Sequence, residues 1–201
     1  MAVPSPIATS TIVAQAFRYM EKSPISSFGD DSDEARAAAE QYPTALRMVL
    51  EIGDWSFASV LREIPEKNLP ASATPDPELP HVYAVPPEAL ILREVEHGRA
   101  RWRRDRDFLR VDQGGKVMLR YTADITDETR LPAQVKNVVA LQLAVLLAPI
   151  YLTTQTKRSQ LSEMLREAVL NALRGDAQTA SPAGWSATSG QGGDWVRWAT
   201  S

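Results

Sequence analysis

The prolines of this chain are concentrated in one place, and their placement limits the fold more than any other feature. Seven of the fourteen prolines lie between Pro65 and Pro87. Proline lacks a backbone N–H and moves the preceding residue out of the helical region. We therefore expect 65–87 to be a long extended connection, with helices only before and after it.

Two helices are predicted ahead of this connection, over 9–21 and 33–52. Both carry apolar residues at i, i+3 and i+4 spacing, which places them on one side of a helix. In the second, Ser32 is a suitable N-cap, and the acidic residues after it favour a helix N-terminus. Pro43 cannot donate to the preceding turn and should kink this helix.

The middle of the chain has the pattern of β-structure. Residues 55–64 and 89–95 are rich in apolar and β-branched residues in rough alternation, which is typical of strands. Residues 100–125 are predicted to form strand, turn and strand, with Gly114–Gly115 as the hairpin turn. These segments together form a small β insertion over about 55–125.

The last third returns to helix, over 132–152 and 157–175. From Val138 the first of these is apolar nearly all round, so other elements must cover it. Its apolar run is shorter than the roughly 20 residues of a membrane span, which favours a buried helix of a soluble cytoplasmic protein. The second is amphipathic, with one apolar face that should pack inward, and Gly175 is a natural stop.

The expected fold class is α+β and mainly α. It is a helical bundle of about four helices with a small antiparallel β-hairpin or sheet insertion. Residues 1–178 form a single domain, and 179–201 form an extended, flexible C-terminal arm. The content of 44% hydrophobic and 23% charged residues is that of an ordinary globular protein with a real core.

Composition also limits the chemistry. The chain has no cysteine, which excludes disulfides, thiol nucleophiles and cysteine-based zinc sites. His81 and His97 are not at ligand spacing, and no phosphate loop, dinucleotide fingerprint, GxSxG or HExxH is present. The net charge of −3 gives no general attraction to nucleic acid or anionic membrane. We predict no catalytic residue, no metal site and no cofactor.

One acidic stretch still invites a metal or acid–base interpretation, since Asp30, Asp31, Asp33 and Glu34 fall within five positions. The stretch lacks the alternating ligands and turn glycine of a calcium loop. Paired catalytic carboxylates need a walled pocket that separates their pKa values, which a solvated helix start does not provide. We favour a helix cap over both alternatives.

A basic stretch at 97–110 is the first candidate interaction surface. Three interpretations are open: a solvated strand edge, an interface with an acidic partner, and a site for single-stranded nucleic acid built from arginine and aromatic residues. As a subunit or tail interface, its candidate residues are Arg99, Arg101, Trp102, Arg103, Arg104 and Arg106.

The C-terminal tail is the second candidate. Exposed tryptophan is enriched in binding hot spots, and this tail is otherwise polar and glycine-rich. The tail either folds back onto its own core or orders on another protein; we favour an arm that binds a portal or a neighbouring subunit. Its candidate residues are Trp185, Asp194, Trp195, Val196, Arg197 and Trp198.

Four stretches, taken in order, carry a resemblance to a known family. They are SPISSFGDDSDEARAAAEQYP at 23–43, GDWSFAS at 53–59, PHVYAVPPEALIL at 80–92, and the stretch from LRYTADI to KRSQL at 119–161. The second contains a Trp-x-Phe-Ala signature at Trp55, Phe57 and Ala58; the third contains Tyr83, Pro86, Glu88 and Leu90 at the family's spacing. Over about residues 10–178 the chain resembles the tail tubular protein A family, the head-to-tail adaptor of tailed phages and phage-like particles. Pro43 and the tryptophan-containing tail depart from that pattern.

The resemblance implies a structural virion protein at the head-to-tail junction, assembled in the host cytoplasm, and not an enzyme. Such adaptors form a ring, typically of twelve copies, beneath the portal protein. The ring extends the DNA channel and provides the docking platform for a downstream tail, nozzle or stopper protein. Double-stranded DNA would pass without specific binding, and no membrane is involved. The alternative is a nucleic-acid-binding module that uses the arginines of 99–110.

Overall fold

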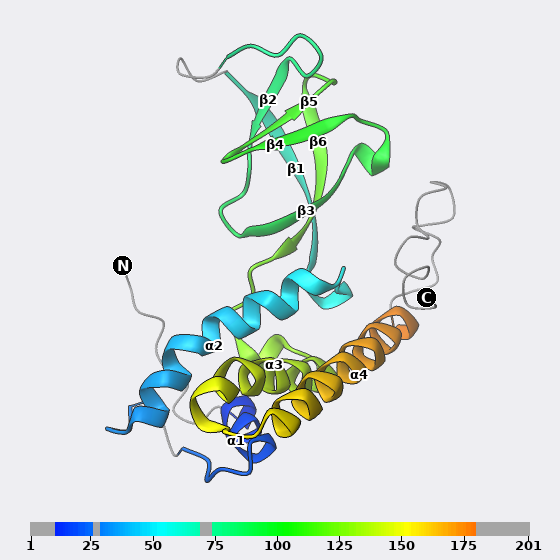
Figure 1. Ribbon diagram of the computed structural model, residues 1–201. Coiled ribbons are helices and arrows are strands. Elements are labelled where there is room, and N and C mark those ends of the chain that lie inside the picture. The colour runs from blue at the N-terminus through cyan, green and yellow to red at the C-terminus, as the bar shows by residue number, and fades with distance from the viewer. Residues whose placement is uncertain (1–10, 26–28, 69–73, 180–201) are drawn as a thin grey trace. The chain divides into compact units, whose positions relative to one another are not determined.

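The computed structural model describes residues 11–25, 29–68 and 74–179 (Figure 1). In them the chain forms four α-helices and a six-stranded antiparallel sheet that is nearly a barrel. The chain divides into two compact units. One contains the part up to Ser59 together with Thr122–Ala177, and the other is built from Val60–Tyr121. We call them the helical unit and the β unit.

The prediction of a helical bundle with a small hairpin insertion is wrong, because the β region is a complete six-stranded sheet. The wrong prediction came from treating the proline-rich segment 65–87 as a connection without strands. β1 (Ser59–Lys67) contains Pro65, and β2 (His81–Ala84) lies inside the segment that we expected to be only a connection. Proline is tolerated in a strand where its missing N–H is not needed by the ladder, so a proline-rich segment can still contribute strands.

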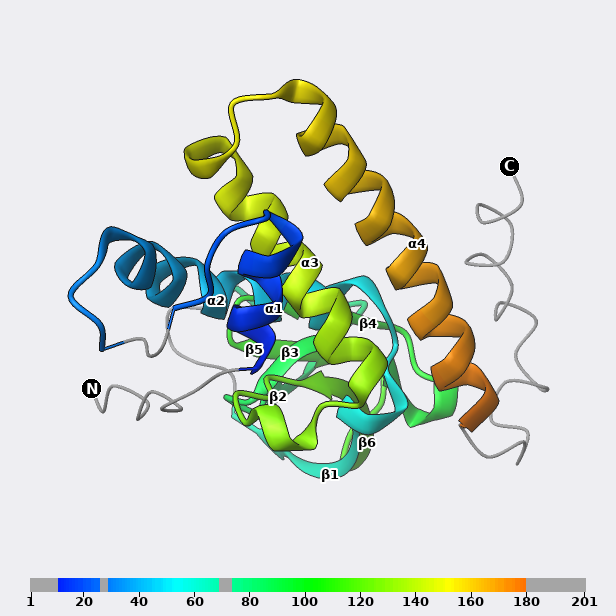
Figure 2. The ribbon, with the colours of Figure 1, turned by 90° about the horizontal axis from the view of Figure 1, so that it is seen from below.

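The helical unit follows the predicted ranges closely, except that its last helix continues to Thr179, so the predicted stop at Gly175 is wrong. Its helices are α1 (Thr11–Tyr19), α2 (Asp33–Ile52), α3 (Ala133–Tyr151) and α4 (Gln155–Thr179). Figure 2 shows α3 between α2 and α4, with α1 against its side. The last two helices are joined by a short connection and run in opposite directions.

The core of the helical unit is α3. Ten of its residues are buried, from Val135 to Ala148. Within the described part of the chain, α3 is the one helix long and apolar enough to cross a membrane by length and composition. More than half of its apolar window is buried in the structure. The packing of α1 and α2 against it provides the cover that an all-round apolar helix requires.

The β unit has the strand order β3-β6-β1-β2-β5-β4. The remaining strands are β3 (Ala89–Val95), β4 (Trp102–Asp105), β5 (Phe108–Val111) and β6 (Lys116–Ala123). The predicted hairpin at Gly114–Gly115 is wrong, because β5 and β6 are not neighbours in the sheet. The tight turn lies instead between β4 and β5, where Asp105 pairs with Phe108 and Arg106 has a φ of 55°. The sequence analysis placed the hairpin turn at the two glycines, because glycine is typical of tight turns, and not at this arginine-containing segment.

Candidate interaction surfaces

The acidic stretch begins α2, as predicted. The Ser32 Oγ accepts a hydrogen bond from the backbone N–H of Ala35 at 3.1 Å, which is N-cap geometry. Asp33 lies in the first turn and pairs with Arg36 at 2.5 Å in an exposed contact. Among the described residues, no group of three or more His, Asp or Glu side chains is arranged to hold a metal ion.

A shallow hollow of about 420 Å³ lies beside this helix start. Its lining includes Lys22, Pro24, Asp31 and Glu34, all of which are exposed. Charges of both signs face solvent there, so the hollow provides no desolvated wall around its carboxylates. Its geometry is that of a turn packed against a capped helix.

The arginines of the β4–β5 hairpin are largely engaged within the protein. Arg103 donates to the Asp105 carboxylate at 2.8 and 3.1 Å, and it pairs with Asp76 at 3.0 Å. On β5, Arg110 donates to Asp105 at 2.6 Å and to the Thr74 carbonyl at 2.8 Å. Two arginines and two aspartates thus form one cluster, which attaches the segment after residue 73 to the hairpin.

Arg110 belongs to the basic stretch that the sequence singled out but not to its predicted interface residues, and Asp76 was not singled out at all. The Arg110 side chain is only 7% exposed, although it is the last residue of the arginine-rich stretch. Hydrogen bonds from Arg103 and Arg110 lower the pKa of Asp105 to about 2. Charge-assisted hydrogen bonds of this kind hold the carboxylate in its ionised form. The flanking Leu109 and Val111 are buried, and that apolar context was the available signal.

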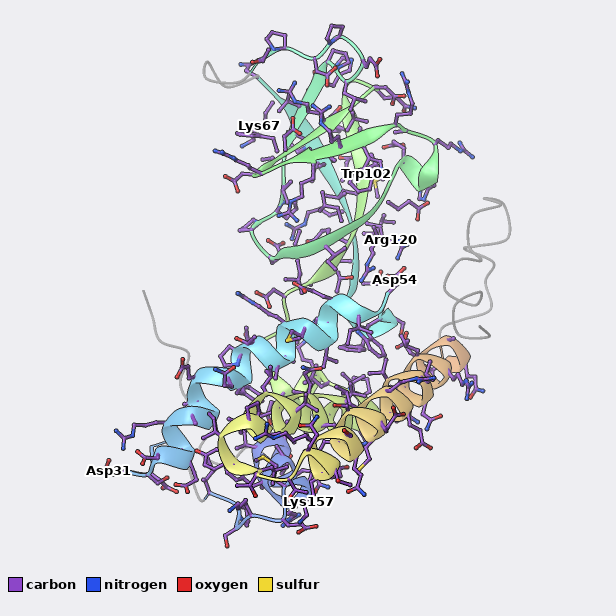
Figure 3. The ribbon with its side chains drawn as sticks, viewed as in Figure 1. Asp31, Asp54, Lys67, Trp102, Arg120 and Lys157 are labelled. Atoms are coloured by element: carbon purple, nitrogen blue, oxygen red, sulfur yellow. The ribbon has the colours of Figure 1, made fainter. Side chains whose placement is uncertain are left out.

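The other candidate arginines differ in their contacts. Arg101 donates to Asp112 through both its backbone N–H and its guanidinium, at 3.1 and 3.3 Å. Arg104 donates to the carbonyls of Arg106 and Leu90 at 3.1 and 3.3 Å. Trp102, labelled on β4 in Figure 3, is half-buried. The structure therefore places four of the six candidates on the β4–β5 hairpin, namely Trp102, Arg103, Arg104 and Arg106. Carboxylates pair with Arg101 and Arg103.

Arg99 follows the 3₁₀ turn Glu96–Gly98, and Arg106 occupies the β4–β5 turn. Both side chains are exposed. The tail candidates Trp185, Asp194, Trp195, Val196, Arg197 and Trp198 lie outside the described residues.

The Trp-x-Phe-Ala signature lies where the chain leaves α2. Trp55 is fully buried, and its indole N–H donates to the Val49 carbonyl at 2.8 Å. That carbonyl belongs to the last turn of α2. Phe57 packs its ring at 5.9 Å from that of Trp55, and Ala58 is buried. The signature thus closes α2 and starts the chain toward β1.

Apolar residues are exposed on the helical unit, which the sequence did not reveal. Met48 and Ile52 of α2 are 39% and 47% exposed, and Ile150 of α3 is 65% exposed. The apolar face of α4 is also incompletely covered, since only Leu161 and Ala172 are buried. The expectation that this whole face packs inward is wrong, because Met164 is exposed and three further apolar residues are only half-buried, namely Leu165, Val169 and Leu173.

Comparisons with known proteins assign no role to these surfaces, so their interpretation depends on the geometry. No family model matches the chain, and no curated protein matches it significantly.

Proposed function

We propose that this chain is a structural head-to-tail adaptor, which forms a ring on a portal protein and provides the platform for the tail. The observation that carries the proposal is the division of one chain into two compact units. Both flanks of the insertion form the helical unit, and 60–121 form the β unit. A closed ring requires two different patches on every subunit, and a two-unit subunit can supply them separately.

The series of family-like stretches supports the same proposal, because its parts have defined places in this fold. The Trp-x-Phe-Ala signature closes α2 at the exit from the helical unit. Tyr83 of the third stretch is fully buried on β2. The stretch 119–161 contains the return from β6 into α3. The signature at 55–58 and the stretch 119–161 thus lie where the chain passes between the two units, and Tyr83 lies within the β unit.

The hairpin supports an interface more than a phosphate-binding site. Arg103 is already held by Asp76 and Asp105, and Arg101 by Asp112. Mixed charges of this kind suit a polar contact with a neighbouring subunit or tail protein. In the proposed ring the hairpin is one patch, and the tail from Trp185 to Trp198 is the portal-binding arm.

Co-sedimentation with a purified portal protein encoded beside this chain tests the proposal, followed by negative-stain imaging. We expect stoichiometric binding and an additional ring layer. Deleting 192–201 should weaken binding while the far-UV circular dichroism spectrum of the folded protein is retained. A matched control exchanges Trp195 and Trp198 for Ser without shortening the chain. Absence of binding between two folded proteins would overturn the adaptor proposal.

A further inference from the structure

The helical unit carries an apolar face that the described residues leave partly uncovered. Its exposed members are Met48 and Ile52 on α2 and Ile150 on α3. Half-buried apolar residues continue it: Val145 and Leu146 on α3, and Leu165 and Val169 on α4. We call this set the α2–α4 face. Contiguous apolar surface of this kind usually marks a binding site.

Contacts between the helices show that these residues share one side of the unit. Gln142 of α3 donates to the Met48 sulfur at 3.6 Å, so the exposed part of α2 adjoins α3. Val145, Leu146 and Ile150 follow Gln142 at helical spacings that keep them near its side of α3. Figures 1 and 2 show α2 and α4 diverging on either side of α3.

The α4 residues face the same region. A Cβ on Gly53, at the end of α2, would lie 2.7 Å from the Leu173 Cδ2, so Leu173 packs against that end. Leu165 and Val169 precede Leu173 at i−8 and i−4, which places all three on one ridge. Met164 lies on the other edge of α4, seven residues after Lys157, which pairs with Glu21 beyond α1. The ridge therefore faces α2, and Met164 lies outside the α2–α4 face.

The residues that follow α4 have the composition and length to reach this face. α4 ends at Thr179, and Trp185, Trp195, Val196 and Trp198 follow in a sequence rich in Gly and Ser. Trp195 is the sixteenth residue after Thr179. A Gly/Ser-rich chain of that length has an r.m.s. end-to-end distance of about 20–24 Å.

The distance to be spanned matches that reach. Fourteen residues of α4 separate Leu165 from Thr179, which is about 21 Å at the helical rise of 1.5 Å per residue. Effective concentration is highest when the r.m.s. length of a linker equals its span, and it reaches about millimolar for short linkers. An intramolecular contact of the tail is thus favoured over the same contact between dilute copies.

We propose that in the unassembled chain residues 194–198 bind the α2–α4 face of their own molecule. The tryptophan rings cover Met48 and Ile150, and partner binding draws the tail away. This inference does not depend on the adaptor function, because it concerns the free chain. It would also keep the apolar face covered until a partner is present.

The absence of native cysteine allows a direct test by disulfide cross-linking of the full chain. Val196→Cys is combined with Met48→Cys on the face or with Met164→Cys outside it. The two methionines are matched controls, with exposures of 39% and 41%. At sub-micromolar protein and without portal, the face pair should form an intramolecular disulfide at least about tenfold faster than the control pair.

Adding Trp195→Ser and Trp198→Ser to the variant with the face cysteine pair should lower its rate of disulfide formation to that of the control pair. Ile52→Cys provides a second face position if Met48→Cys fails to fold, as judged by circular dichroism. Equal rates for face and control pairs would overturn the proposal. Disulfide-linked dimers without intramolecular product would also overturn it, because the occupant would then be the tail of a second copy. A positive result together with absent portal binding would retain this inference and remove the adaptor proposal.

Discussion

Trp55→Phe is the sharpest test of how the helical unit is closed. The indole N–H of Trp55 donates to the Val49 carbonyl at 2.8 Å, and the ring is fully buried. Phenylalanine removes the donor and so breaks this buried hydrogen bond, which costs about 0.5–1.5 kcal/mol. The smaller ring also loses buried apolar area and leaves a cavity, which adds about 1–2 kcal/mol. We expect the free energy of unfolding to fall by about 1.5–3.5 kcal/mol.

Urea denaturation followed by far-UV circular dichroism measures this loss, since the signal at helical wavelengths reports the helical unit. The matched control is Trp102→Phe, the same exchange at a half-buried position of the β unit. We expect the control to lower the free energy of unfolding by less than about 1 kcal/mol. If Trp55→Phe costs no more than the control, the indole does not hold the end of α2, and this reasoning is refuted.

Three further predictions concern packing, capping and pH. Gly53→Ala should lower the free energy of unfolding by about 1–3 kcal/mol in a thermal or urea melt, because the new Cβ meets Leu173 and the indole ring of Trp55. Leu173→Ala, added to Gly53→Ala, should recover part of this loss. If the effects of the two substitutions simply add, the contact between residues 53 and 173 is contradicted. Ser32→Ala should lower the free energy of unfolding by about 0.5–2 kcal/mol through loss of the α2 cap, and an unchanged melt would exclude that role. The pKa of Asp105 falls from about 3.8 to about 2 on folding, so its contribution to stability is present above the higher pKa and is lost as pH falls toward the lower. Asp105→Asn should flatten the stability profile between those values, which a urea series at several pH values would measure.

The helices were predictable because local signals agreed with the tertiary structure. The Ser32 cap and the acidic first turn placed the start of α2 at the observed residue. α3 was expected to be covered because its apolar residues surround the helix, and it is the core of its unit. The helical spacing of apolar residues and the capping residues are both set by residues close together in the chain, so a single sequence is enough to predict them.

The sheet was not predictable in the same way. Strand order depends on partners far apart in the chain, such as β2 with β5, which no local pattern specifies. β2 lies between Pro80 and Pro86, where local rules favour a connection. Burial of Arg110 is also a tertiary effect, since it depends on Thr74 and Asp105 being brought to the same strand. The exposure of part of α4 likewise depends on how the helices diverge, which its amphipathic pattern does not record.

The arginine contacts of the hairpin also determine which residues could bind nucleic acid, if the alternative function is correct. Arg103 is held between Asp76 and Asp105, so binding a phosphate would require it to leave a neutralised cluster. Arg99 and Arg106 make no ion pair within the described residues. If the hairpin binds nucleic acid without opening the contacts of Arg103 and Arg104, Arg99 and Arg106 must carry the affinity.

Binding of a labelled duplex and of its single strand, at about 50 mM salt and then at higher salt, tests this alternative. For an adaptor we expect no binding by either strand form at micromolar protein, because the channel should pass DNA without retaining it. Binding that weakens steeply with salt and falls more in Arg99→Ala/Arg106→Ala than in Arg103→Ala/Arg104→Ala would favour the nucleic-acid module. Equal losses in both double variants would show that the contacts of Arg103 and Arg104 open on binding. Asp76 and Asp105 would then compete with phosphate for Arg103 rather than fix the hairpin.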